Sequence, residues 1–200
     1  MTEYTELFDR DFRENQKDKM LGSREVRARR YHNVFNLIRG LKFGEALDIG
    51  CADGEFTGRL GKVAYAVSGI DVSPVAIEQA KEALPGFDFR VGNATELPFP
   101  DSSFNLVSCL DVLYYLDEAG RKKAVDEVCR VLKPQGFFLV TTSWPWRTKT
   151  RTGMSYMRMD DVRGLLGGRF VLLDTMPTSK RFEFIWTGAA MLFRKNDVNG

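Results

Sequence analysis

The sequence is poor in the residues that mark metal centres, disulfide-bonded folds and membrane spans. It has one histidine and three cysteines, and its acids and histidine form no cluster that predicts a metal site. The odd cysteine count argues against a disulfide framework and favours a reducing compartment, so we expect a cytoplasmic protein. No apolar run approaches the roughly 18 residues that cross a bilayer. The polar, acidic segment Met1–Glu6 also lacks the pattern of a secretory signal.

Opposite charges nearly cancel over the whole chain. It has 29 Lys and Arg residues and 27 Asp and Glu residues, which leaves a net charge of +2. Residues 41–143 contain 10 basic and 15 acidic side chains, whereas residues 144–200 contain 10 and 5. The basic C-terminal part fits an anionic group on a substrate, or is ordinary surface charge. The balance is too mild to indicate bulk binding of nucleic acid.

Short apolar runs alternate with segments of helical period from about residue 45 onward. The runs predict strands at 46–49, 65–70, 87–91, 104–110 and 137–142. Helical spacing of apolar residues predicts helices at 55–62, 74–84 and 124–132, the second with Ser73 as its N-cap. This alternation predicts an α/β fold with a doubly wound, mostly parallel sheet and helices on both faces.

The two ends of the chain depart from this alternation. Residues 1–40 are rich in charges and include a predicted helix at 23–39. After Ser143, a short helix at 159–166 and strands at 170–173 and 182–193 predict an antiparallel strand at one edge of the sheet. We therefore divide the chain into an N-terminal helical cap or lid (1–40), a main domain (41–195) and a flexible tail (196–200).

One turn and the acid that follows it indicate a bound cofactor. The predicted strand that contains Asp48 leads into a turn with Gly50, Ala52 and Gly54 at every second position. Small residues let the backbone approach a ligand closely. The next strand ends in Asp71, which fits the roughly 20 residues expected before an acid that binds ribose hydroxyls. The pattern predicts a site for an adenosine-containing cofactor.

These motifs, with others in the same order, are similar to those of the class I S-adenosylmethionine-dependent methyltransferases. The resemblance covers residues from about 45 to 193 and rests on five segments: Leu47–Gly54, Gly69–Val72, Gly92–Phe99, Ser103–Val107 and Arg130–Gly136. A nicotinamide-dependent dehydrogenase is the nearest competitor, but its turn reads Gly-x-Gly-x-x-Gly and does not explain the Lys-Pro-Gln-Gly turn at 133–136. Ala52 and Asn93 depart from the glycine and aspartate common in the family.

The resemblance implies a Rossmann-like, seven-stranded sheet, and S-adenosyl-L-methionine as the cofactor with S-adenosyl-L-homocysteine as its product. In this interpretation Asp71 binds the ribose, and Arg30 is our choice for the methionine carboxylate. Asp48 has two interpretations, a hydrogen-bond partner of the loop amides or the cofactor's ammonium group, and a brace for the turn. The full set of expected cofactor-binding residues is Arg30, Asp48, Gly50, Cys51, Gly54, Asp71, Val72, Asn93, Ala94 and Leu110.

The sequence is less informative about catalysis. Many small-molecule relatives carry a histidine near the end of the segment after the fourth strand, where this chain has Tyr114 and Tyr115. Our catalytic candidates are Asp111, Tyr115 and His32, although Asp111 is equally interpreted as a helix cap and His32 as a structural residue. The expected acceptor pocket consists of Tyr115, Trp144, Trp146, Arg147 and Tyr156.

Motifs for several acceptor classes are absent. The sequence has no Asp/Asn-Pro-Pro-aromatic motif of base amino-methyltransferases, no Pro-Cys nucleophile and no paired-glutamate loop of arginine methyltransferases. We therefore expect methyl transfer to a nitrogen or oxygen of a small, possibly anionic molecule, by a monomer or homodimer that acts on neither membranes nor nucleic acid. Val112–Leu116 resembles the nodulation N-methyltransferases, which points to nitrogen. The alternatives are an RNA or protein methyltransferase and a non-catalytic cofactor-binding partner protein.

Overall fold

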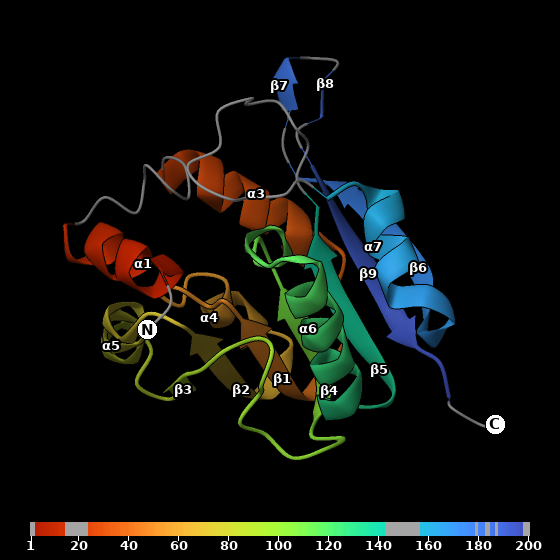
Figure 1. Ribbon diagram of the computed structural model, residues 1–200, viewed down its shortest axis with the longest axis horizontal. Coiled ribbons are helices and arrows are strands. Elements are labelled where there is room, and N and C mark those ends of the chain that lie inside the picture. The colour runs from red at the N-terminus through yellow and green to blue at the C-terminus, as the bar shows by residue number, and fades with distance from the viewer. Residues whose placement is uncertain are drawn as a thin grey trace.

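The computed structural model describes residues 3–14, 24–142, 157–178, 180–182, 185–186 and 188–197. A central sheet lies between layers of helices (Figure 1). Its strands are β1 (Phe43–Ile49), β2 (Ala64–Asp71), β3 (Asp88–Val91), β4 (Phe104–Cys109), β5 (Leu132–Thr141), β6 (Phe170–Pro177) and β9 (Ala189–Lys195). The helices are α1 (Glu3–Arg13), α3 (Arg24–Asn36), α4 (Thr57–Leu60), α5 (Pro74–Ala83), α6 (Glu118–Val131) and α7 (Met159–Leu166). Short 3₁₀ turns, η1 and η2, cover Leu113–Tyr115 and Gly167–Arg169.

The seven strands follow the order β3-β2-β1-β4-β5-β9-β6. The first five are parallel, whereas β9 runs antiparallel to both β5 and β6. Strand order reverses after β1, where the chain crosses from β3 on one side to β4 on the other. The predicted doubly wound, mostly parallel sheet is confirmed, but the antiparallel strand expected at the edge is β9, which lies one position in from the edge strand β6.

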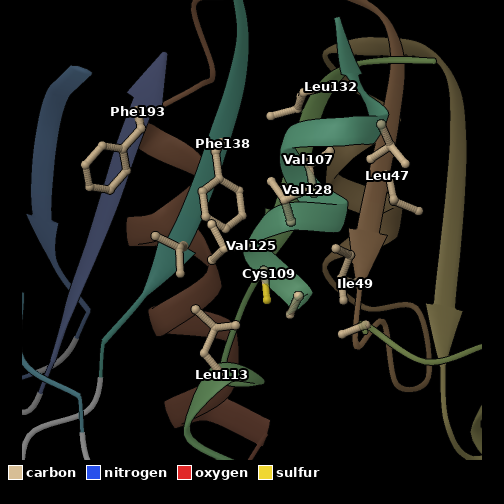
Figure 2. Packing of buried hydrophobic residues seen from close by; sticks show 14 of the residues in the cluster. Leu47, Ile49, Val107, Cys109, Leu113, Val125, Val128, Leu132, Phe138 and Phe193 are labelled. Carbon is tan, nitrogen blue, oxygen red and sulfur yellow. The ribbon is translucent and has the colours of Figure 1, made fainter. Parts of the chain in front are cut away.

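Each face of the sheet has its own apolar layer. Alternate residues of a strand point to opposite faces, so Leu47 and Ile49 of β1 pack with Val125 and Val128 of α6 (Figure 2). On the other face, Ala46 belongs to a second cluster. It includes Val34 of α3, Ile38 just after that helix, Leu60 of α4, Leu106, Leu139 and Leu192. Burial on both faces explains why the central strands are nearly continuous apolar runs.

Two helices begin where their capping residues indicate. The Ser73 hydroxyl accepts a hydrogen bond from the Ala76 N–H at 3.1 Å, and Pro74 occupies the first turn of α5. Asp117 caps α6 by accepting from the Gly120 N–H at 2.7 Å. This second cap leaves Asp111 without a capping role for α6.

Several predicted elements differ in extent from the observed ones: the helix expected at 124–132 begins at Glu118, and the strand expected at 170–173 continues to Pro177. The helix expected at 55–62 is only the single turn of α4, and the helix expected at 23–39 ends at Asn36. Strand β5 begins at Leu132 and includes the predicted turn as a bulge, in which Gln135 has a φ of 60°. The run expected as one strand at 182–193 is divided between a small hairpin, β7 (Lys180–Phe182) with β8 (Ile185–Trp186), and β9.

Gly188 directly precedes β9, and its backbone passes close to the backbone of Thr142. A Cβ on Gly188 would lie 2.5 Å from the backbone oxygen of Thr142, and the Gly188 carbonyl accepts from the Thr178 N–H at 3.0 Å. The described ranges contain no helix with the length and apolar character needed to cross a bilayer. They also contain no group of three metal-ligating side chains.

Candidate active site

A pocket lies beyond the carboxyl ends of β1, β2, β3 and β4, where ligands bind in open α/β sheets. Its wall has three parts. The ends of β2 and β3 contribute Ile70, Asp71, Val72, Gly92, Asn93 and Ala94; the segments after β1 and β4 contribute Gly50, Ala52, Leu110, Asp111, Val112, Tyr115 and Leu116; the N-terminal helices contribute Phe8, Phe12 and Tyr31. Eight predicted site residues are thus brought together: Gly50, Asp71, Val72, Asn93, Ala94, Leu110, Asp111 and Tyr115.

The turn after β1 is shaped by left-handed residues. Gly50, Ala52 and Gly54 have φ values of 73°, 50° and 81°. A Cβ on Gly50 would lie 2.2 Å from Cγ2 of Val112, so only glycine leaves room at this point. The N–H groups of Gly50 and Cys51 both donate to the Ile70 carbonyl, at 2.8 and 2.9 Å, which fixes the turn against β2.

The Asp71 carboxylate lies at the end of β2, on the pocket wall. Its Oδ2 accepts from the Ala52 N–H and its Oδ1 from the Ser73 N–H, each at 3.0 Å. Burial raises the pKa of Asp71 even though these backbone hydrogen bonds lower it. Each carboxylate oxygen has a second lone pair, so the group can accept two further hydrogen bonds from a ligand.

Asp48, Cys51 and Gly54 lie behind the pocket and are not part of its wall. The Asp48 oxygens accept from the hydroxyls of Thr57 and Ser108, both at 2.7 Å. Burial raises the pKa of Asp48 to about 6. Of the two roles expected for Asp48, these contacts fit a brace for the turn. Cys51 is buried in a cluster with Ile77, Ala80 and Phe89.

The loop after β3 forms the far side of the pocket. Asn93 Oδ1 accepts from the N–H and hydroxyl of Thr95, at 3.0 and 3.1 Å, which is the arrangement of a turn residue. Arg130 of α6 holds the following residues. Its guanidinium donates to the carbonyls of Leu97 and Phe99, at 3.0 and 2.8 Å. This contact explains an arginine in the motif Arg130–Gly136.

Helix α1 also contributes to the pocket wall and was not predicted as a separate helix. Phe8 and Phe12, four residues apart, both line the pocket. The helix is held against α5, beside which it lies in Figure 1, by a hydrogen bond from the Ser73 hydroxyl to Asp9. The Phe8 ring also meets the Tyr115 ring edge to face, with centroids 5.2 Å apart. The spacing of Phe8 and Phe12 was the available signal in the sequence.

Asp111 lines the pocket from the segment after β4 and has a left-handed conformation, with a φ of 59°. The Thr141 hydroxyl accepts from the Asp111 N–H at 2.8 Å and donates to Asp111 Oδ1 at 3.2 Å. Oδ2 forms an ion pair with Nη2 of Arg30 from α3. Arg30 is not part of the pocket wall. Its guanidinium lies 5.5 Å from the ring centre of Tyr31, and Tyr31 does line the pocket.

The remaining candidates either lie away from the pocket or fall outside the described residues. His32 is exposed on α3 and is absent from the pocket wall, so the lone histidine is not retained as a catalytic candidate. Trp144, Trp146, Arg147 and Tyr156 lie outside the described residues. The same holds for most of 144–158, whose course would distinguish a closed small-molecule pocket from an open groove for a macromolecule.

Comparison with known proteins agrees with this geometry. Residues 47–140 match the sequence model of a family described as methyltransferase domain. Over 99 residues the chain is 36% identical to a probable S-adenosylmethionine-dependent methyltransferase of Mycolicibacterium smegmatis, covering 49% of this chain and 37% of that protein. It is 26% identical over 163 residues to nodulation protein S of Azorhizobium caulinodans, covering 74% and 78%. The chain thus spans well under half of the first of these relatives and most of the second.

The fold has similar solved structures. The N-methyltransferase NodS from Bradyrhizobium japonicum, in complex with S-adenosyl-L-homocysteine, aligns with a TM-score of 0.82 at 20% identity, over 96% of this chain and 97% of that one. At this identity the likeness concerns the fold. Residues 47–140, which include the glycine turn and Asp71, match the methyltransferase-domain family and resemble S-adenosylmethionine-dependent methyltransferases, and the fold is that of a solved methyltransferase.

Proposed function

We propose that the protein is a methyltransferase that uses S-adenosyl-L-methionine to methylate a nitrogen or oxygen of a small molecule. The observation that supports this most is the position of the Asp71 carboxylate beside the Gly50 turn, in one pocket with apolar residues on either side. The N-methyltransferase name of a similar structure favours nitrogen over oxygen. A cytoplasmic location and a monomer or homodimer stay predictions.

The residues of the pocket fit the cofactor chemically. Asp71 offers acceptors for the two ribose hydroxyls, and the side chains of Val72 and Ala94 offer apolar surface to the adenine ring. Gly50 has no side chain, so its backbone is free to approach the methionine part of the cofactor. A Cβ at this position would also collide with Val112. In this proposal the Asn93 amide binds the adenine edge and Leu110 contributes its backbone carbonyl near the sulfur.

When bound, S-adenosylmethionine supplies an electrophilic methyl group that a nucleophile takes by direct displacement. The chain contributes position and shielding from water. Phe8, Phe12, Tyr31 and Tyr115 surround the pocket with aromatic rings, and α1 acts as a lid over it. A pocket lined by aromatic rings favours a self-sufficient enzyme over a non-catalytic partner protein. The large exposed apolar side chains in the described ranges lie on α3, β2, β3 and β6: Val26, Tyr65, Val91, Val171 and Leu173.

The proposal is tested by incubating the purified chain with S-adenosylmethionine labelled on its methyl group. Acceptors are supplied as matched pairs of amines and alcohols of the same carbon skeleton, with and without an added carboxylate. We expect label on at least one small acceptor, with one equivalent of S-adenosylhomocysteine formed for each methyl group transferred. Label on RNA or protein alone would favour the macromolecular alternative, and cofactor binding without any transfer would favour the non-catalytic one.

A further inference from the structure

Three polar atoms beside the pocket have unmet hydrogen-bonding capacity. Nε and Nη2 of Arg30 and Oδ2 of Asp111 are buried and have no hydrogen-bond partner among the described residues. Nη2 and Oδ2 lie in contact as an ion pair, but their arrangement lacks the geometry of a hydrogen bond. Buried polar atoms are nearly always hydrogen-bonded in folded proteins, so this cluster points to a ligand that completes it.

The two side chains come from separate parts of the chain, Arg30 from α3 and Asp111 from the segment after β4. Asp111 is fixed through its N–H and Oδ1 by the Thr141 hydroxyl, which leaves Oδ2 on the side of Arg30. Arg30 extends from α3 and its side chain is 20% exposed, against 13% for Asp111. Asp111 raises the pKa of Arg30 although burial alone would lower it. The pair therefore lies beside the pocket, with Asp111 on its wall.

We propose that this ion pair exchanges partners as the site fills: Arg30 takes the carboxylate of the cofactor's methionine part, and Asp111 takes the ammonium group of an amine acceptor. The inference rests on the proposed function and names its acceptor class. A guanidinium matches a carboxylate in a bidentate fork, and the present contact with Asp111 uses one nitrogen without proper alignment. A ligand carboxylate is thus a better partner for Arg30 than Asp111 is.

Exchange at Arg30 creates the acceptor site. Once Arg30 has turned to the cofactor, the Asp111 carboxylate is a part-buried charge without its cation, which is costly. A protonated amine restores the balance and passes one proton to Asp111 before its lone pair can take the methyl group, whereas an alcohol offers a hydrogen bond without charge. Asp111 lines the pocket, so an amine bound there lies within the same chamber as the cofactor. The structure thereby implies that cofactor binding precedes and strengthens amine binding.

The first half of the proposal is tested by calorimetry with two ligands. S-Adenosylhomocysteine contains the amino-acid carboxylate, and 5′-methylthioadenosine lacks it. Asp111→Asn removes the competitor for Arg30, so we expect S-adenosylhomocysteine to bind about threefold or more tightly to this variant. Arg30→Gln should weaken the same ligand about tenfold. Binding of 5′-methylthioadenosine should change in neither variant.

Matched controls separate this effect from damage to the fold. Asparagine is well tolerated at a φ of 59°, so Asp111→Asn keeps the backbone of the site. Asp160→Asn changes a 91% exposed side chain on α7, and Arg29→Gln changes an exposed arginine on α3. Both controls should bind both ligands as the unchanged protein does. Equal shifts for the two ligands in Asp111→Asn, or no shift in either, would overturn the exchange at Arg30.

The second half is tested by titrating benzylamine and benzyl alcohol with and without saturating S-adenosylhomocysteine. We expect the amine to bind more tightly when S-adenosylhomocysteine is present, and expect this coupling to vanish in Asp111→Asn. Coupling that is the same for the alcohol, or that survives in Asp111→Asn, would overturn the assignment of Asp111. If neither nucleoside ligand binds the unchanged protein, the proposed function itself has failed, which is a different outcome.

Discussion

Gly50 gives the sharpest prediction about the turn that builds the site. Its φ of 73° lies in the left-handed region, and a Cβ would come within 2.2 Å of Val112 Cγ2. Gly50→Ala is therefore expected to destabilise the folded state in two ways. The left-handed conformation costs a residue with a Cβ about 1–2 kcal/mol, and overpacking against Val112 adds about 1–3 kcal/mol. We expect unfolding to become easier by about 2–5 kcal/mol in total.

Thermal unfolding measures this cost. For a chain of this length, 1 kcal/mol shifts the melting temperature by about 2–4 °C, so Gly50→Ala should melt at least about 4 °C lower. Gly86→Ala is the matched control, because Gly86 is exposed, has no left-handed φ and has no atom within 4 Å of a built Cβ. S-Adenosylhomocysteine should also bind more weakly to Gly50→Ala, since the turn lines the pocket.

A double variant separates the two contributions. Val112→Ala removes the atom that the new methyl group meets, so Gly50→Ala combined with Val112→Ala should lose less stability than the sum of the single changes. The difference should be about 1 kcal/mol or more. An unchanged melting temperature in Gly50→Ala would refute the left-handed turn. Strict additivity in the double variant would refute the steric contact with Val112.

Three further changes test other parts of the account. Burial raises the pKa of Asp48 to about 6 from an ordinary 3.8, so the folded state binds the extra proton. The free energy of unfolding, relative to that of Asp48→Asn, should therefore fall as the pH rises from about 4 to about 6, and urea titrations at several pH values that show no such slope would contradict this. Phe8→Ala opens the lid and loses the contact with Tyr115. The calorimetric affinity for S-adenosylhomocysteine should therefore fall several-fold while the melting temperature changes little. An unchanged affinity would show that α1 is not part of the site. Arg130→Ala leaves the carbonyls of Leu97 and Phe99 and the Glu127 carboxylate without their donor. The free energy of unfolding in urea should fall by about 2–3 kcal/mol. A fall of less than about 0.5 kcal/mol would show that the loop after β3 is stable without Arg130.

The strands and the cofactor side of the site could be predicted because their signals are local. A buried parallel strand is a continuous apolar run, and the acid at the end of β2 follows the glycine turn at a fixed distance. Gly50 and Asp71 therefore occupy the positions expected from the sequence. The same reasoning predicted the cap at Ser73 and the helix at 159–166.

The acceptor side could not be predicted because its contacts join distant segments. Whether Arg30 meets Asp111 depends on how α3 packs on the sheet and on the left-handed backbone at Asp111, neither of which has a signature in the sequence. His32 was a candidate because it is the lone histidine. The helical phase of α3 places it on the exposed side, whereas Tyr31 faces the pocket. The aromatic spacing of α1 lies within a strongly charged segment, which obscured the helix.

The central claim is that this pocket binds the cofactor through Asp71, and titration calorimetry of S-adenosylhomocysteine tests it most directly. The account predicts a dissociation constant in the range of about 1–100 μM for the unchanged protein and at least a tenfold loss, about 1.4 kcal/mol, for Asp71→Ala. Asp174→Ala, which changes an exposed acid on β6, should bind as the unchanged protein does. No binding to the unchanged protein, or equal binding to Asp71→Ala, would contradict the account.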